Sequence, residues 1–174
     1  MRYRRARMPG GTYFFTVNLA ERKRTLLVEQ IDALRRAVRK VLTEHPFHID
    51  AMVVLPDHLH VFWTLPKGDV DFPTRWASIK AGFSRCIPAD ERRSQSRITK
   101  GERSIWQRRY WEHLIRDEKD YARHVDYIHY NSVKHGYVRY VVKWPYSSFH
   151  RYMEQGMYDK GWAAEPNNGN FGEP

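Results

Sequence analysis

The stretch Leu55-Pro56-Asp57-His58-Leu59-His60-Val61-Phe62-Trp63-Thr64-Leu65 is the one around which the rest of the chain is organised. Its Pro-Asp pair favours a turn, and the alternation that follows predicts the second strand of a β-hairpin. Side chains two residues apart on a strand share a face, so we expect His58, His60 and Phe62 to point the same way. The other face then carries Leu59, Val61, Trp63 and Leu65.

The two histidines suggest a metal site. Two imidazoles side by side on a strand can bind one metal ion, because histidine is the commonest metal ligand. The alternative is that His58 and His60 form only a polar face of the sheet. A further ligand from another element would favour the metal, and a helix that contains Tyr127 and Asn131 offers one.

The composition points to a basic globular protein. The chain has 174 residues, of which 41% are hydrophobic, which suits one domain and excludes a disordered protein. Its net charge of +10 favours a polyanionic partner, nucleic acid first and an anionic membrane second. The basic residues lie among aromatic ones rather than in one tail, which favours nucleic acid. The alternative is a solvated basic surface.

Cysteine content and hydropathy bear on the cellular compartment of the protein and on membrane contact. Cys86 is the only cysteine, which excludes an intramolecular disulfide and a cysteine-based zinc cluster. The basic N-terminus lacks the apolar run of a signal peptide, and no window reaches the ~18 apolar residues of a membrane span. We therefore expect a cytoplasmic, nucleoid-associated protein with no membrane contact.

Hydrophobic periodicity gives the order of elements β-α-β-β-α-β-α. Strands are expected at residues 12–18, 47–55, 58–65 and 104–115, and helices at residues 28–45, around Trp76 to Ile87, at 117–135 and, if Ser147 or Ser148 caps it, up to Gln155. Residues 88–103 show no periodicity and are expected to form a mobile loop. The first six elements match a ferredoxin-like α+β unit, a four-stranded antiparallel sheet with two helices on one face. The last long helix is then free to cover the other face.

One domain accounts for this pattern. We expect it to cover residues 1–156, with a basic arm at 1–11 and a flexible C-terminal tail at 157–174. The arm carries Arg2, Arg4, Arg5 and Arg7, whose charge suits phosphate contact.

The expected helix at 117–135 brings a third ligand type to the histidines. Tyr127 and Asn131 are four residues apart and share a face, and an apolar stripe beside them could seat the helix on the protein. Two imidazoles and one carboxamide oxygen leave open coordination positions. Mixed nitrogen and oxygen ligation of this kind suits Mg²⁺ or Mn²⁺ when phosphate supplies further oxygens. Asn131 could instead bond the backbone, and Tyr127 could merely pack.

Several motifs in order resemble one family. His58-Leu59-His60 resembles the two-histidine motif of single-tyrosine, single-strand DNA transposases, and residues 126–136 (DYIHYNSVKHG) resemble their catalytic helix. Residues 10–16 (GGTYFFT), 106–113 (WQRRYWEH) and 144–149 (WPYSSF) complete a resemblance to the REP-associated tyrosine transposases. It covers roughly residues 4 to 155. The chain departs from the family at Ser132, where the usual residue is proline, and this change should let the helix continue.

The resemblance implies a mechanism. Tyr127 would attack a DNA phosphodiester and give a 5′-phosphotyrosine and a free 3′ hydroxyl, while His58, His60 and Asn131 hold the metal. The substrate would be single-stranded DNA with hairpins formed by repetitive extragenic palindromes (REPs), read at a GTAG tetranucleotide beside the stem. Arg108, Arg109 and Lys134 would contact phosphates, as would the arginines of the arm. The group is expected to act as a monomer.

Alternatives stay open for the chemistry and for single residues. The chain could be a catalytically silent module that binds DNA or RNA hairpins, or a metal-dependent hydrolase that uses activated water. Tyr130 is the rival nucleophile. Glu112, His124 and His129 are candidates for a base or ligand but are expected to be structural, and Asp57 is expected to be a turn residue.

Overall fold

The computed structural model describes residues 7–163, and the order of elements within them matches the predicted α+β pattern. The strands are β1 (Thr12–Asn18), β2 (His48–Val54), β3 (His58–Thr64) and β4 (Trp111–Leu114). The helices are α1 (Leu26–Glu29), α2 (Ile31–Glu44), α3 (Phe72–Arg85), α4 (Gln95–Thr99), α5 (Glu118–Lys134) and α6 (Phe149–Glu154), with a 3₁₀ turn at Val141–Lys143.

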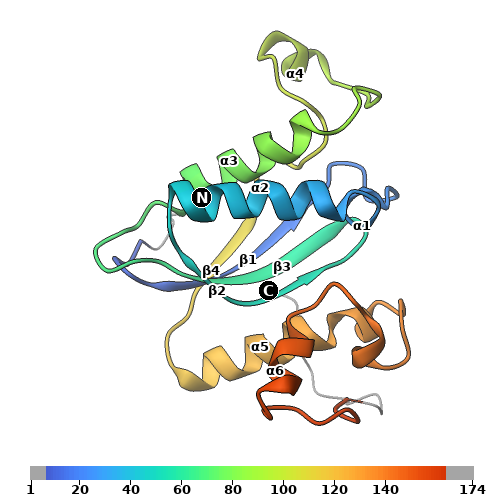
Figure 1. Cartoon of the computed structure of the whole chain (residues 1–174). Helices are drawn as coiled ribbons and strands as arrows, with labels where there is room; N and C mark the ends of the chain where they lie inside the picture. Colours follow the sequence, from blue (N-terminus) through green and yellow to red (C-terminus); the bar gives the residue numbers. More distant parts are fainter. Residues whose placement is uncertain (1–6, 164–174) are drawn as a thin grey trace, which may run out of the picture.

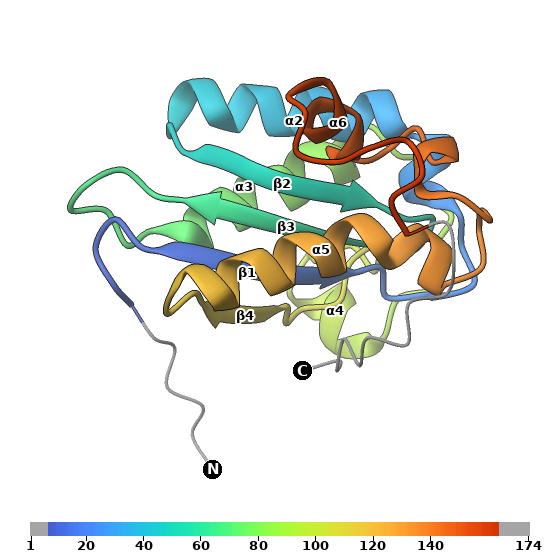
Figure 2. The same cartoon turned by 90° about the horizontal axis from the view of Figure 1, so that it is seen from below.

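The four described strands form one antiparallel sheet in the order β2-β3-β1-β4. Helices α2 and α3 cover one face, and α5 and α6 cover the other (Figure 1). Seen from the α5 side, α5 lies across the sheet (Figure 2), and it packs on β2 and β3. This arrangement confirms the predicted ferredoxin-like fold with an additional helix.

Two apolar layers follow from the alternation along β3. Leu59, Val61 and Trp63 belong to the core beneath α2 and α3. Phe62 belongs to the second core, beneath α5, together with Phe14. Alternate residues of β3 therefore enter the two different cores, as the sequence predicted.

The segment at residues 88–103, which the sequence predicted to be a loop without regular structure, is held against α3 by one arginine. The Arg103 guanidinium donates to the carbonyl oxygens of Ser84 and Ile87 at 3.0 and 3.2 Å, and it pairs with Glu91. The segment also contains the short helix α4. These contacts satisfy carbonyl groups at the end of α3 and hold the segment against it.

Other boundaries differ in detail. The expected first helix is divided at Gln30 into α1 and α2. The last strand is shorter than predicted, because only Trp111–Leu114 pairs with β1, and before it Trp106 makes an isolated bridge to Leu19. Among the helices at residues 7–163, none combines the length and apolar character that crossing a membrane would require.

Helix α5 has well-defined ends. The side chain of Asp117 accepts a hydrogen bond from the backbone N–H of Asp120 at 2.8 Å, which caps the N-terminus. At the other end the N–H of Tyr137 donates to the carbonyl of Ser132, and Gly136 adopts a φ of +73°, a conformation that favours glycine. The helix is thus fixed in length, with the sheet beneath it.

Candidate active site between β3 and α5

The structure brings the strand histidines and the helix tyrosine together. The ring centroid of Tyr127 lies 5.2 Å from that of His60, and those of His58 and His60 are 5.0 Å apart. All three side chains are buried, with 3%, 4% and 7% of the surface of His58, His60 and Tyr127 exposed. The meeting arises because i, i+2 spacing aims both imidazoles at α5, which packs on β2 and β3.

Each imidazole is oriented through its Nδ1 atom. Nδ1 of His58 lies 2.6 Å from Oδ1 of Asp57, and Nδ1 of His60 lies 2.8 Å from Oγ1 of Thr16. A hydrogen bond at one ring nitrogen fixes the ring and directs the other nitrogen toward a ligand. Asp57, expected to be only a turn residue, therefore holds one of the two histidines in place.

Two buried polar atoms at this site have no hydrogen-bond partner within residues 7–163. They are Nε2 of His60 and Oδ1 of Asn131. The Nδ2 atom of Asn131 donates to the backbone oxygen of Tyr127 at 3.4 Å, so its oxygen points elsewhere. Buried polar atoms are seldom left unsatisfied, and nitrogen and oxygen acceptors of this kind are what a divalent cation coordinates. The donor set fits Mg²⁺ or Mn²⁺.

Burial favours the neutral form of both histidines, which is the form that binds metals. Burial lowers the pKa of His58, and the neighbouring Asp57 carboxylate opposes this effect only in part. Burial also holds the pKa of His60 well below its usual value, helped by the positive charge that His58, His135 and Lys134 can carry. The Asn131 side chain acts in the opposite direction and raises the pKa of His60, so its amide lies near the ring.

His58, His60 and Tyr127 border a cavity of about 250 Å³, whereas Asn131 is not among its lining residues. It is lined by Thr16, Asn18, Arg22, His58, His60, Trp111, Tyr127 and His135. Sequence reasoning missed five of these lining residues, namely Thr16, Asn18, Arg22, Trp111 and His135. His135 follows Asn131 by four residues, so the spacing that linked Tyr127 to Asn131 would also have pointed to it.

The other candidates lie away from this cavity. Tyr130, the rival nucleophile, does not line it. Burial lowers the pKa of His129 to about 3, and its Nε2 lies 2.8 Å from Oγ of Ser148, so it is a structural residue. Glu112 pairs in register with Phe15, which belongs to the core beneath α2 and α3, so it faces the opposite side of the sheet.

His124 belongs to a second group of metal-ligand types, with His113 and Asp120. Their ligand atoms lie within 4.8 Å of one another, close enough to hold a metal ion. The Asp120 carboxylate lies 2.8 Å from His113 Nε2 and 3.1 Å from His124 Nδ1. These groups already satisfy one another, whereas His60 and Asn131 leave acceptors unsatisfied. The latter pair is therefore the better candidate for binding a metal ion.

Some of the basic residues predicted to contact phosphate lie within the described part of the chain. Arg2, Arg4 and Arg5 lie outside the described residues, and Arg7 and Arg109 are exposed. Arg108 is exposed and pairs with Glu102 at 2.7 Å. The Nζ atom of Lys134 lies 4.9 Å from the ring centroid of Tyr127, which adds positive charge beside the cavity.

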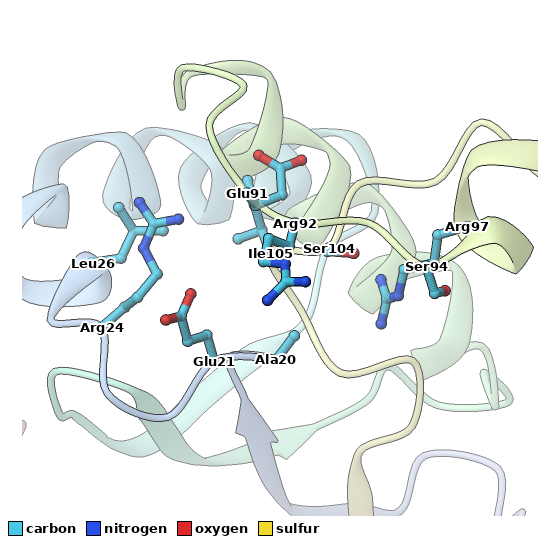
Figure 3. Close-up of a pocket in the computed structure, with 10 residues that line it drawn as sticks. All are labelled: Ala20, Glu21, Arg24, Leu26, Glu91, Arg92, Ser94, Arg97, Ser104 and Ile105. Atoms are coloured by element: carbon cyan, nitrogen blue, oxygen red, sulfur yellow. The ribbon is translucent and has the colours of Figure 1, made fainter.

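Another cavity, of about 400 Å³, is lined by side chains of different types. Figure 3 shows its lining residues, which come from the β1–α1 loop, α1 and the segment at residues 91–105. Its charged side chains are of both signs, Glu21 and Glu91 with Arg24, Arg92 and Arg97, and it has no histidine or tyrosine. Nothing in its lining offers a nucleophile of the tyrosine type.

Comparison with known proteins gives a consistent result. A family model described as "Transposase IS200 like" matches residues 11–131. The chain is 47% identical over 171 residues to a REP-associated tyrosine transposase of Escherichia coli, covering 98% of this chain and 96% of that one. A relative in Haemophilus influenzae is 45% identical over 165 residues, with 94% of each chain covered.

A solved structure shares the fold. It is a REP-associated tyrosine transposase bound to a REP hairpin, with 46% sequence identity and a TM-score of 0.83. The match covers 100% of this chain and 98% of that one. At this identity the likeness extends beyond topology to sequence.

Proposed function

Because this chain belongs to the IS200-like transposase family, and within it to the REP-associated tyrosine transposases, we propose that it cleaves and rejoins REP-type hairpin DNA through Tyr127. The observation that carries the proposal is the position of the Tyr127 ring beside His60 in one cavity, with the unsatisfied oxygen of Asn131 nearby. A transposase acts on DNA strands, and the net charge of +10 suits such a polyanion.

In the proposed reaction the Tyr127 oxygen bonds to the phosphorus of a DNA phosphodiester. The bond from phosphorus to the 3′ oxygen breaks, the phenolic proton leaves Tyr127, and the 3′ oxygen is released as a hydroxyl. The product is a 5′-phosphotyrosine, and attack by a 3′ hydroxyl reverses the step and joins strands without ATP. Lys134, beside the Tyr127 ring, adds positive charge where the phosphate must sit.

His58, His60 and Asn131 would hold the metal. When bound, a divalent ion such as Mg²⁺ or Mn²⁺ polarises the phosphate and offsets the charge that develops on its oxygens. The protein prepares this position in advance, since Asp57 and Thr16 fix the two imidazoles before any ion arrives. Substitution of either histidine should therefore lower metal affinity and not only activity.

A labelled REP-type hairpin oligonucleotide tests the proposal. Wild-type protein with Mn²⁺ should give a protein–DNA adduct on a denaturing gel. Tyr127→Phe should give none, while the matched control Tyr130→Phe should keep it. Cleavage that survives in Tyr127→Phe would instead support hydrolysis by activated water. Tight binding without cleavage by wild-type protein would leave a hairpin-binding module.

A further inference from the structure

A cation from the loop after β1 reaches the candidate active site. Arg22 lies between β1 and α1, and its side chain is 48% exposed. It lines the 250 Å³ cavity together with His58, His60 and Tyr127. No motif in the sequence marked this arginine, since it lies in a basic loop far from the histidines along the chain.

The guanidinium of Arg22 is held from two sides. Nε donates to Oδ2 of Asp57, and Nη1 donates to Oδ1 of Asn18 at 2.8 Å. The other carboxylate oxygen of Asp57 is bound by His58, so one aspartate fixes both the arginine and the histidine. A planar guanidinium held in this way keeps little rotamer freedom and presents its remaining N–H groups in a known direction.

Donors remain for a ligand. Arginine has five N–H groups, and the bonds to Asp57 and Asn18 use one each. Nη2 lies 3.4 Å from Nδ1 of His58, but that nitrogen carries the proton it donates to Asp57, so it offers Nη2 no lone pair. The Nη2 donors are therefore available on the side of the cavity.

We propose that Arg22 binds a non-bridging oxygen of the scissile phosphate and stabilises the charge that gathers there as Tyr127 attacks. The inference rests on the proposed function and deepens it by assigning a catalytic residue. In phosphoryl transfer the equatorial oxygens carry most of the negative charge, and arginine matches their geometry with parallel N–H groups. Because the guanidinium is already fixed, little reorganisation is needed during the reaction.

Arg22 could instead act only through Asp57, by orienting His58 for the metal. The two roles differ in what they change. A residue that only positions His58 should lower metal affinity, and excess Mn²⁺ should restore the rate. A residue that contacts phosphate should lower the rate at saturating Mn²⁺ and leave metal affinity almost unchanged.

The first experiment measures adduct formation in single turnover with saturating hairpin and Mn²⁺. Arg22→Gln should slow it by roughly 10²–10³-fold, the loss typical when one preorganised donor is removed. Arg22→Lys should recover part of the rate. Arg24→Gln is the matched control, because Arg24 is in the same loop but pairs with Asp90 at the other cavity. A rate within about threefold of wild type, or full rescue by excess Mn²⁺, would overturn the inference.

A second experiment does not depend on catalysis. Binding is compared in Tyr127→Phe and in Tyr127→Phe with Arg22→Gln, using hairpins whose single-stranded flank carries either phosphodiesters or neutral methylphosphonates. Arg22→Gln should weaken binding of the phosphodiester flank and leave the methylphosphonate flank unaffected. Equal effects on both flanks would contradict a phosphate contact. If Arg22→Gln weakens binding only for the phosphodiester flank while wild-type protein forms no adduct, the phosphate contact stands and the covalent mechanism fails.

Discussion

The ring of Tyr127 on α5 lies edge-on to the imidazole of His60 on β3, with 5.2 Å between their centroids and an interplanar angle of 72°. Phe14 of β1 packs against both rings. The tyrosine thus reaches the histidines only while α5 stays seated on the sheet. Side chains that orient the histidines or seat the helix should therefore affect the chemistry without touching DNA.

Asp57→Asn should weaken metal binding. The carboxylate orients His58 through Nδ1, and loss of such a partner typically costs about 10–100-fold in metal affinity. Calorimetric titration of Mn²⁺ into DNA-free protein measures this directly. Asp50→Asn is a control on β2, outside the lining of the cavity. Unchanged Mn²⁺ affinity in Asp57→Asn would mean that the metal does not bind through His58.

Asp120→Asn should destabilise the protein whether or not metal is present. Burial raises the pKa of Asp120, but the hydrogen bonds from His113 and from the backbone of Arg116 outweigh it and lower the pKa overall, so the carboxylate is charged at neutral pH. The substitution removes the charged acceptor beside His113 and His124, while His124 Nδ1 keeps the backbone oxygen of residue 120, so we expect a cost of about 1–3 kcal/mol in the free energy of unfolding. Urea denaturation with EDTA and with Mn²⁺ measures this cost. Glu118→Gln, in the same turn, is the exposed control. A wild-type gain in stability with Mn²⁺ that Asp120→Asn alone removes would show a metal site there.

The Glu91–Arg103 pair should make stability depend on acid pH. The hydrogen bond from Arg103 lowers the pKa of Glu91 from 4.5 to about 2. A carboxyl group whose pKa is lower in the folded state stabilises the fold above its unfolded pKa, and this contribution is lost as pH falls from about 4.5 to 2. Glu91→Gln should therefore have a lower melting temperature than wild type at pH 7. On acidification its melting temperature should fall by less than that of wild type. If the melting temperatures of both proteins fall by the same amount between pH 7 and 3, the Glu91–Arg103 pair is not the cause of the acid dependence.

Lys134→Gln should reduce the salt dependence of hairpin binding. Each phosphate contact releases counterions, so removal of one should lower the slope of log K against log salt by about 0.7–0.9. Fluorescence anisotropy in the Tyr127→Phe background measures the slope. Lys40→Gln, on α2 at the opposite face of the sheet, should leave it unchanged. The same slope in both variants would remove Lys134 from the DNA interface.

The alternation around His58 and His60 was enough to predict which face of the sheet would meet α5, because register on a strand with two buried faces has few alternatives. The spacing of Tyr127 and Asn131 likewise follows from helix geometry. The partners of Asp57 could not be predicted, since Arg22 lies 35 residues away and only the tertiary fold brings it near. The same holds for Arg103, because the carbonyl group of Ser84 to which it donates lies 19 residues earlier in the chain.

The most direct test of the central claim is to locate the covalent bond by mass spectrometry. After reaction with a REP-type hairpin and Mn²⁺, trypsin releases residues 124–134, a peptide that contains both Tyr127 and Tyr130. Fragmentation should place a 5′-linked nucleotide phosphate on Tyr127. A nucleotide on Tyr130, or cleaved DNA with no modified peptide, would contradict the account.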